Sequence, residues 1–487
     1  MTSASAWPTM ARDVLAEVEA RLWPLVDRVM AARHLPGMAV GVVADGAVVA
    51  ARGFGVADLG GGGPVTEHSL FHVASVSKPF VAMAALRLVD AGVLDLDAPV
   101  SRYLPYVRVG GAHADVITTR HLLTHTVGIP DVEDYRWHEP EVDDGALERF
   151  VRTLADVDAL HPPGERFEYC NAGYEVAGAV VAKVSGRTFE RCLAEEVLAP
   201  LGMPTSTFLA RSVPPELATG PHLGAPPHRI PGTYPYHRGH APSSTLHSSA
   251  VELCQAAIAL LNEAPDATTG APFLSAASRE AMWRPQLATG WSDRAGSMAT
   301  GWFVGTYRGH RVVSHEGEDP GFNAYWALLP DVRGAVVVLA NANTAPVLGL
   351  GDAALDVVLG VEQEVDPAVL RIPITVPVGS AIADGGVDAG IEAYRRHADD
   401  DGYDASPDAF MESVWGAVEM YETEAVRPML DVWRAVQPED AQMWAALGWA
   451  DLQDGNLVDA RQHLTRSLEL DPDDDEARAF LRRLERM

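Results

Sequence analysis

The sequence predicts a larger domain of the α/β (α+β) class followed by a small all-α domain. Two β-rich runs meet at Asp45-Gly46, and an apolar run over residues 81–89 has the length and composition of a buried helix. Beyond residue 386 the apolar spacing is helical. We therefore expect a first domain over residues 1–365, a linker over 366–385 and a helical domain over 386–487.

Composition limits the classes of function. The 487 residues are 47% hydrophobic, which is ample for a large core, and 67 acidic against 37 basic residues give a formal net charge of −30. This charge opposes binding to nucleic acid or to anionic membranes. No stretch approaches the roughly 20 apolar residues of a membrane span. We expect no nucleic-acid partner and no membrane.

The compartment is predicted from the first residues and from the cysteines. Residues 1–8 contain neither the basic nor the apolar region of a secretory signal. The three cysteines, Cys170, Cys192 and Cys254, form neither a disulfide framework nor a CxxC metal pattern. Unpaired cysteines fit a reducing compartment. We therefore expect a cytoplasmic protein.

The first 55 residues predict one helix and one hairpin. Residues 10–34 have an apolar stripe at helical spacing, and Pro24 marks an expected kink. Residues 38–43 and 48–53 are rich in β-forming residues, and the Asp45-Gly46 pair between them favours a type I′ turn. We expect the helix to pack against the sheet to which the hairpin belongs.

Ser75 and Lys78 are the first candidate catalytic pair. They lie three residues apart at the start of the helix predicted over 81–89, so their Cβ atoms would be roughly 5–6 Å apart. A partly desolvated lysine has a lowered pKa and can take the proton of a serine nucleophile. The positive end of the helix would favour a developing oxyanion. A helix-capping serine followed by a surface lysine is the alternative, because S-x-x-K alone is a weak signal.

Tyr169-Cys170-Asn171 is the second candidate segment. A phenol beside a lysine would have a lowered pKa, and its phenolate could carry the serine proton to the leaving group. The amide of Asn171 could hold Lys78 and a substrate carbonyl. A loop tyrosine followed by an asparagine turn is the alternative for an isolated Y-x-N, and Cys170 is expected to be a buried, passive thiol.

These segments carry a resemblance to a known family. The core Ser75-Val76-Ser77-Lys78, with Phe71 before it and Pro79-Phe80 after it, resembles the active-site segment of the serine β-lactamase and penicillin-binding-protein superfamily, especially its class C and esterase branch. The resemblance covers roughly residues 10–360. It implies an antiparallel sheet flanked by helices, with a helical lobe that carries Tyr169.

The resemblance also identifies a third motif, at residues 315–318. Strands are predicted over 300–305 and 311–314, and His315-Glu316-Gly317-Glu318 follows where the superfamily commonly has Lys-Thr-Gly on an edge strand. Gly317 would let the substrate backbone approach closely. The N–H groups of Glu318 and Ser75 would form the oxyanion hole. A histidine in place of the lysine removes a fixed cation, which weakens the case for carboxylated substrates such as β-lactams.

Two further expectations concern the surroundings of these motifs. His121 and His125 lie four residues apart, but no third ligand follows at a known spacing, so we interpret both as structural and expect no metal or cofactor. Residues 211–240 are rich in Pro, His and Gly, and we expect a long loop over the site that selects the substrate.

The C-terminal residues resemble a tetratricopeptide repeat. Six residues fall at the spacing of that repeat: Trp444, Leu447, Gly448, Gly455, Ala460 and Pro472. Residues 407–440 are interpreted as a decayed earlier unit, and residues 371–379 as an extended, Pro-punctuated linker. So few units need a further surface. We expect them to dock on the first domain, with a protein partner as the alternative, and we expect the chemistry to be separable from them.

Together the motifs predict a serine hydrolase that forms an acyl-enzyme with a small ester or amide, most closely an esterase. Three enzymatic alternatives stay open: a D-amino-acid peptidase or amidase, a β-lactamase, and an acyltransferase. An inactive scaffold that binds protein through its helical tail is the alternative of another class.

Overall fold

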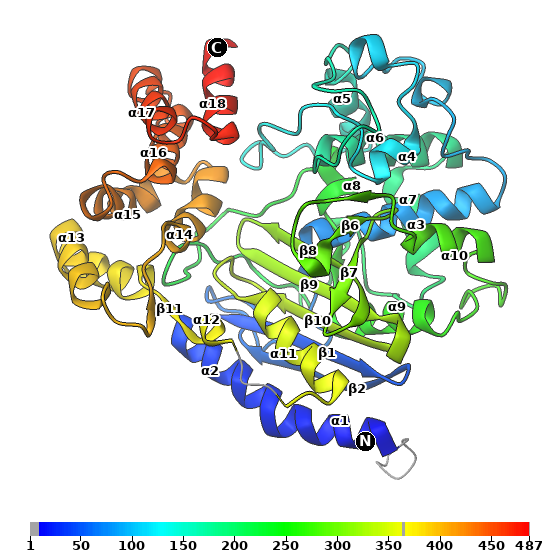
Figure 1. The fold of residues 1–487 in the computed structure, drawn as a ribbon, viewed down its shortest axis with the longest axis horizontal. Helices are drawn as coiled ribbons and strands as arrows, with labels where there is room; N and C mark the ends of the chain where they lie inside the picture. Colours follow the sequence, from blue (N-terminus) through cyan, green and yellow to red (C-terminus); the bar gives the residue numbers. More distant parts are fainter. Residues whose placement is uncertain (1–8, 363–365, 487) are drawn as a thin grey trace.

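The computed structural model describes residues 9–362 and 366–486, and Figure 1 shows the fold. The first eight residues, used above to predict the compartment, and the expected boundary at residue 365 lie outside the described residues. The centre is an eight-stranded antiparallel sheet in the order β2-β1-β10-β9-β8-β7-β6-β5. Its strands are β1 (Gly37–Ala44), β2 (Ala47–Gly55), β5 (Leu287–Ala288), β6 (Ser297–Met298), β7 (Phe303–Tyr307), β8 (His310–Asp319), β9 (Phe322–Leu329) and β10 (Gly334–Ala340).

The predicted helix and hairpin at the start of the chain are both present. Asp45 and Gly46 have φ values of 51° and 71°, the positive values that a type I′ turn requires at both central residues. The expected kinked helix consists of α1 (Thr9–Glu17), a π-helical turn (Val18–Leu22) and α2 (Trp23–Arg33). Pro24 lacks an N–H to bond to the preceding turn, and the irregular turn lies directly before it.

Helices cover both faces of the sheet (Figure 1). Side chains of successive strand residues point to opposite faces. Accordingly Val336 and Val338 of β10 belong to a core with α1, α2 and α11 (Val347–Leu359), and Val337 and Leu339 to a core with α3 (Ser77–Asp90), α6 (Asn171–Ser185) and α9 (Ala250–Leu261). The second core extends into a helical lobe. Its other helices are α4 (Thr119–Leu123), α5 (Ala146–Thr153), α7 (Phe189–Leu193), α8 (Ala241–Ser244) and α10 (Ala276–Trp283).

The residues expected as an extended linker are largely helical, so that prediction is wrong. After α12 (Pro367–Leu370) and the two-residue strand β11 (Ile372–Pro373), which pairs with β12 (Tyr403–Asp404), helix α13 spans Thr375–His397. It is kinked at Gly386, whose φ of 78° is not helical. Pro377 falls within the first turn of α13, where a backbone N–H has no partner inside the helix. Proline therefore does not exclude a helix here. The domain boundaries stay a prediction.

The remaining tail consists of helices that pack in order. They are α14 (Pro407–Glu419), α15 (Thr423–Val436), α16 (Ala441–Gln453), α17 (Leu457–Leu470) and α18 (Asp475–Arg486). Gly448 of α16 packs directly against Leu464 of α17, because a Cβ on Gly448 would lie 2.6 Å from the Leu464 side chain. The helices are those expected, and their assignment as tetratricopeptide repeats stays a prediction.

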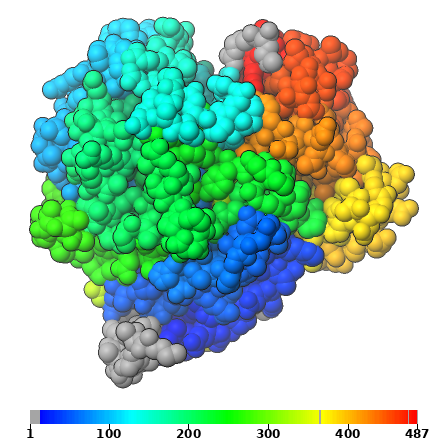
Figure 2. Space-filling view, turned by 180° about the vertical axis from the view of Figure 1, so that it is seen from behind, coloured from blue at the N-terminus to red at the C-terminus, as the bar shows by residue number. Residues whose placement is uncertain are grey.

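The tail is docked on the rest of the chain, as expected. Trp137 and Leu223 from the preceding domain share one hydrophobic core with Phe410 and Trp433 of the tail. Figure 2 shows the two parts in contact along one side of the molecule. Within residues 9–362 and 366–486, no helix is both long and apolar enough to span a bilayer.

Candidate active site

Ser75 lies at the N-terminal end of α3, as the sequence predicts. It belongs to a 3-10 turn (Ala74–Val76) that leads into the helix. Ala74 has a φ of 47°, a left-handed value that L-residues with a Cβ rarely adopt and that is often found at functional sites. The turn leaves Ser75 half-buried, while Lys78 is fully buried below it.

Lys78 contacts the serine directly. Its Nζ lies 2.7 Å from Ser75 Oγ and donates to the carbonyl of Ser243, in α8, at 2.9 Å. Burial lowers the pKa of Lys78 to about 8, and the carboxyls of Glu175, Asp319 and Asp131 oppose that shift. An amine with this pKa is partly neutral near neutral pH, and it can then accept the Ser75 proton.

Tyr169 reaches the same serine, but as a neutral phenol. Its ring centroid lies 5.0 Å from Lys78 Nζ. Burial raises the pKa of Tyr169 well above its usual value, and the hydrogen bond with Ser75 opposes this only in part. The prediction that the lysine lowers this pKa enough to give a phenolate is therefore wrong, because desolvation disfavours the charged phenolate. A neutral hydroxyl can still donate a proton to a leaving group.

The two histidines have structural roles, as interpreted from the sequence. His121 closes a capping box with Thr118 at the start of α4. His125 stacks on Tyr169 with ring centroids 4.1 Å apart, and its Nδ1 accepts the N–H of Cys170 at 2.9 Å. His125 thus holds the segment that carries Tyr169.

Asn171 lines the cavity but does not hold Lys78 as expected. Its side-chain amide donates to Asp131 at 2.9 Å, and Asp131 also accepts the N–H of Ala172 at 2.9 Å. A carboxylate at the first turn of α6 satisfies N–H groups that lack partners within the helix, so the Asn171 amide is drawn to that carboxylate. Lys78 donates instead to the carbonyl of Ser243, where the sequence predicts the Asn171 amide.

The third motif lies on a locally free edge of the sheet. β7 pairs with β8 only as far as Ser314, whereas β9 pairs with it to Asp319. Residues 315–319 thus have one open side, and the Ser75 turn occupies it. A Cβ on Gly317 would lie 2.3 Å from the carbonyl oxygen of Val73 and 2.9 Å from the Ser75 nitrogen. Gly317 thus allows a close approach of the chain's own backbone, and the expected approach of a substrate backbone stays a prediction.

His315 is a neutral side chain in the cavity wall. Burial, with a smaller effect of Lys78, lowers its pKa to about 3. Its Nδ1 lies 2.6 Å from the carbonyl oxygen of Glu316, so Nδ1 carries the proton and Nε2 keeps a lone pair. The N–H groups of Glu318 and Ser75 remain our predicted oxyanion hole, and the short distance from Gly317 to the Ser75 nitrogen is consistent with it.

The candidate residues meet at a cavity of about 320 Å³. Ser75, Tyr169, Asn171, His315, Gly317 and Glu318 line it, together with Tyr135, Ser243, Ser244, Trp291, Phe303, Glu316, Asp319 and Trp415. No residue of 211–240 lines it, so the expected substrate-selecting loop is not at the site. Apart from Tyr169, the aromatic side chains of the lining come from segments for which the sequence carries no motif: Tyr135, Trp291, Phe303 and Trp415.

Sequence reasoning also missed the groups that support the motifs. Glu175 is fully buried and accepts the Ser243 hydroxyl at 2.5 Å. The Asp319 carboxylate accepts from the Ser244 hydroxyl and lies 2.6 Å from His72 Nε2. These two contacts join β8, α8 and the strand before Ser75. A carboxylate buried beside a lysine has no local signature. Only the positions of Glu175 and Asp319, close to two of the motifs, could have drawn attention to them.

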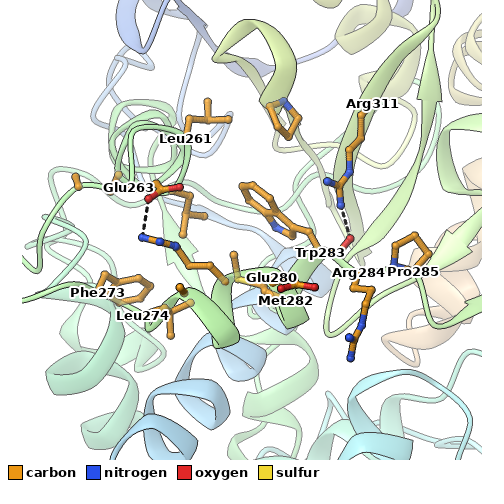
Figure 3. A pocket seen from close by; sticks show the side chains of 16 residues that line it. Leu261, Glu263, Phe273, Leu274, Glu280, Met282, Trp283, Arg284, Pro285 and Arg311 are labelled. Atoms are coloured by element: carbon orange, nitrogen blue, oxygen red, sulfur yellow. Dashed lines mark hydrogen bonds and ion pairs between the residues drawn. The ribbon is translucent and has the colours of Figure 1, made fainter.

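A larger cavity of about 670 Å³ lies elsewhere (Figure 3). It is bounded by α9, α10 and the start of β8. Its charged side chains are largely occupied: Arg279 pairs with Glu263 at 2.9 Å, and Arg311 donates to the carbonyl of Trp283. It contains none of the candidate residues. The candidate active site is therefore the smaller cavity, which the candidate residues line.

Comparisons with known proteins identify the family of this chain. The family model described as Beta-lactamase matches residues 24–359. "Penicillin-binding protein 4" of Amycolatopsis lactamdurans is 32% identical over 66% of this chain and 84% of its own length. "Esterase EstB" of Burkholderia gladioli is 36% identical over 46% of this chain and 60% of its own length. The octameric penicillin-binding protein homologue from Pyrococcus abyssi superposes with a TM-score of 0.64, at 25% identity over 75% of this chain and 82% of that one.

Proposed function

Because this chain belongs to the beta-lactamase family of serine hydrolases, we propose that it cleaves small esters through an acyl-enzyme on Ser75. The observation that carries this proposal is the 2.7 Å contact between Ser75 Oγ and a fully buried Lys78 Nζ. A serine hydroxyl needs such a base to become a nucleophile.

The proton can be followed through the proposed reaction. Ser75 Oγ attacks the carbonyl carbon as its proton moves to neutral Lys78, and the oxyanion is bound by the N–H groups of Ser75 and Glu318. When the carbon–oxygen bond to the leaving alkoxide breaks, Tyr169 donates its proton and is reprotonated from Lys78. Water then attacks the acyl-enzyme with the same groups in reverse. The acid is released and Ser75 regains its proton.

Two observations support an ester rather than a carboxylated β-lactam. His315 is neutral, with its pKa lowered to about 3, so it offers no cation to a substrate carboxylate. The cavity wall carries the carboxyls of Glu316, Glu318 and Asp319, which disfavour an anionic substrate. The 36% identity to a protein named as an esterase points the same way.

A reducing, cytoplasmic location also remains our proposal. Its support is that Cys170, Cys192 and Cys254 are each buried and unpaired.

Intact-mass spectrometry tests the function. The protein is incubated with p-nitrophenyl esters, D-amino-acid amides, penicillins and cephalosporins, and the mass of the acyl adduct is read at short times. We expect adducts and p-nitrophenol release from the neutral esters, and far slower acylation by the β-lactams. Adducts from D-amino-acid amides alone would favour the amidase alternative, and no adduct with any compound would contradict the proposal.

A further inference from the structure

We propose that the helical tail forms part of the active site, with Trp415 of α14 and Glu318 of β8 selecting substrates that carry an ammonium group near the scissile carbonyl. The inference rests on the proposed function and specifies its substrate class. It starts from one contact that the motifs do not predict: Trp415, 340 residues after Ser75 in the sequence, lines the same cavity.

The tail brings Trp415 to the cavity through close backbone packing. A Cβ on the next residue, Gly416, would lie 2.8 Å from the Leu223 side chain and 3.0 Å from Asn343 Oδ1. Asn343 in turn donates to the carboxylate of Glu318 at 3.3 Å and to the carbonyl of Asp319 at 3.0 Å. Helix α14 is thus seated on the end of β8 that carries the third motif.

Polar contacts at the end of α14 fix it in place. Tyr421 donates to Asp134 at 2.5 Å, and Arg483 of α18 donates to the same carboxylate at 2.7 Å. Tyr135, the residue after Asp134, lines the cavity together with Trp415. Both aromatic walls are therefore positioned by the contact between the tail and the preceding domain.

Acidic side chains gather at this wall. Glu412, Trp415 and Glu419 recur at the spacing of one helical face. Glu412 and Asp319 both act on Glu318, whose pKa is raised to about 7, chiefly by the protein that encloses it. Asp134 and Asp319 act on Glu419, whose pKa burial raises to about 8. Carboxylates gathered in this way would each be stabilised by an added cation.

The nearby basic groups are already engaged. Lys78 is fully buried below Ser75, Arg294 pairs with Asp352 at 2.6 Å, and Arg483 pairs with Asp134. The histidine in the lining, His315, is neutral because burial lowers its pKa to about 3. The cavity therefore offers carboxylates and aromatic faces without a competing cation in its lining, and an ammonium group is the ligand that both features attract.

Matched esters test the inference. Acetylthiocholine is compared with its carbon isostere, in which a tert-butyl group replaces trimethylammonium. A p-nitrophenyl ester of trimethylammonio-substituted pentanoic acid is compared with its tert-butyl counterpart. The two pairs place the cation on the leaving-group side and on the acyl side. We expect the wild-type kcat/KM to favour the cationic member of at least one pair.

Variants then assign the preference to residues. Trp415→Leu should lower the ratio of cationic to neutral kcat/KM on the order of tenfold, Trp415→Phe less, and Glu318→Gln should also lower it. Trp444→Leu is the matched control, because Trp444 lies on α16, donates to the Pro438 carbonyl and does not line the cavity. Its ratio should equal that of wild type.

The outcomes separate the inference from the proposed function. The inference alone is overturned if the members of both ester pairs are turned over with no preference for the cationic one. It is also overturned if Trp415→Leu has an intact thermal melt and an unchanged ratio of cationic to neutral kcat/KM. Should Trp415→Leu fail to fold, the ratio in Trp415→Phe and Glu318→Gln decides. No turnover and no acyl adduct with any ester overturns the proposed function and this inference with it.

Discussion

Lys78 shows how strongly surroundings decide the role of one residue. An exposed lysine is protonated at neutral pH and cannot act as a base. Here full burial lowers the pKa to about 8, even though Glu175, Asp319 and Asp131 favour the charged form. The residue that the pattern S-x-x-K only suggested as a base acquires that property from packing.

The activity should therefore depend on pH through Lys78. Protonated Lys78 cannot accept the serine proton, so kcat/KM should rise about tenfold per pH unit below pH 8 and level off above it. The measurement is kcat/KM for a neutral p-nitrophenyl ester from pH 5.5 to 9.5. Glu318→Gln is the control, because the Glu318 carboxyl has a pKa of about 7. A midpoint that disappears in this variant would show that Glu318, not Lys78, governs the profile.

Substitution of the three catalytic groups should separate chemistry from folding. Ser75→Ala removes the nucleophile and should abolish acylation, while Lys78→Ala and Tyr169→Phe should each reduce kcat on the order of 10²-fold or more. Ser75→Ala deletes one oxygen of a half-buried side chain and should melt like wild type. Turnover by Ser75→Ala in the p-nitrophenyl ester assay would refute the mechanism.

Gly317 should tolerate no side chain. A methyl group at this position would lie 2.3 Å from the Val73 carbonyl, so Gly317→Ala must push β8 away from the Ser75 turn. We expect kcat to fall by at least tenfold, since such a shift misplaces the predicted oxyanion donors. Gly63→Ala is the control, because its added Cβ meets nothing within 4 Å. Wild-type kcat in Gly317→Ala would contradict this account of the strand.

At the scale of elements, the site depends on where strands end. β8 and β9 continue past the last residue of β7, and the Ser75 turn fills the side that β7 leaves open. The sequence predicted strands over 300–305 and 311–314, but β9 was not predicted, and the relative lengths of these strands follow from pairing between distant segments. Helix α14 packs at this same end of β8.

Gly416→Val tests that packing. The larger side chain would collide with Leu223 and Asn343, so α14 should move away from β8. Overpacking typically costs about 1–3 kcal/mol, and we expect a lower melting temperature together with a lower kcat/KM for the ammonium esters. Thermal melts and the paired ester assays measure both, with Gly63→Val as the control. An unchanged melt and an unchanged ester ratio would show that the contact is unimportant.

At the scale of the whole molecule, the tail and the preceding domain share one core. Trp137 and Leu223 are buried against Phe410, Leu430 and Trp433 in a single cluster. Our sequence-based expectation that the tail docks is thus confirmed. The expectation that the chemistry is separable from the tail stays a prediction, and Trp415 of the tail lines the cavity at which that chemistry is proposed.

Truncation to residues 1–366 should reveal both effects. Removal of the tail exposes Trp137 and Leu223, so the fragment should melt at a lower temperature or be less soluble. Ser75, Lys78 and Tyr169 are retained, so any folded fragment should still be acylated by p-nitrophenyl acetate but should lose its preference for ammonium esters. An unchanged melting temperature, or a fragment that keeps the full preference, would contradict these expectations.

Much of the fold was predictable because its causes are local. The Asp45-Gly46 turn and the helix after Ser75 follow from backbone preferences and side-chain period, which neighbouring residues determine. The prediction of an extended linker is wrong because the effect of a proline depends on its position in the folded element. The prolines of residues 371–379 indicate an extended segment, but Pro377 lies in the first turn of α13, where a missing backbone N–H costs little.

The sequence by itself determined that Ser75 and Lys78 share one turn, and its motifs placed Tyr169 and residues 315–318 in the same site. Tertiary structure alone decided the charge states of the side chains at the site and which residues form the cavity walls. Burial made Tyr169 a neutral phenol and His315 a neutral imidazole, and docking of the tail brought Trp415 to Glu318. Spacing along a helix is fixed by covalent geometry, whereas desolvation and contacts between distant segments exist only once the whole chain has packed.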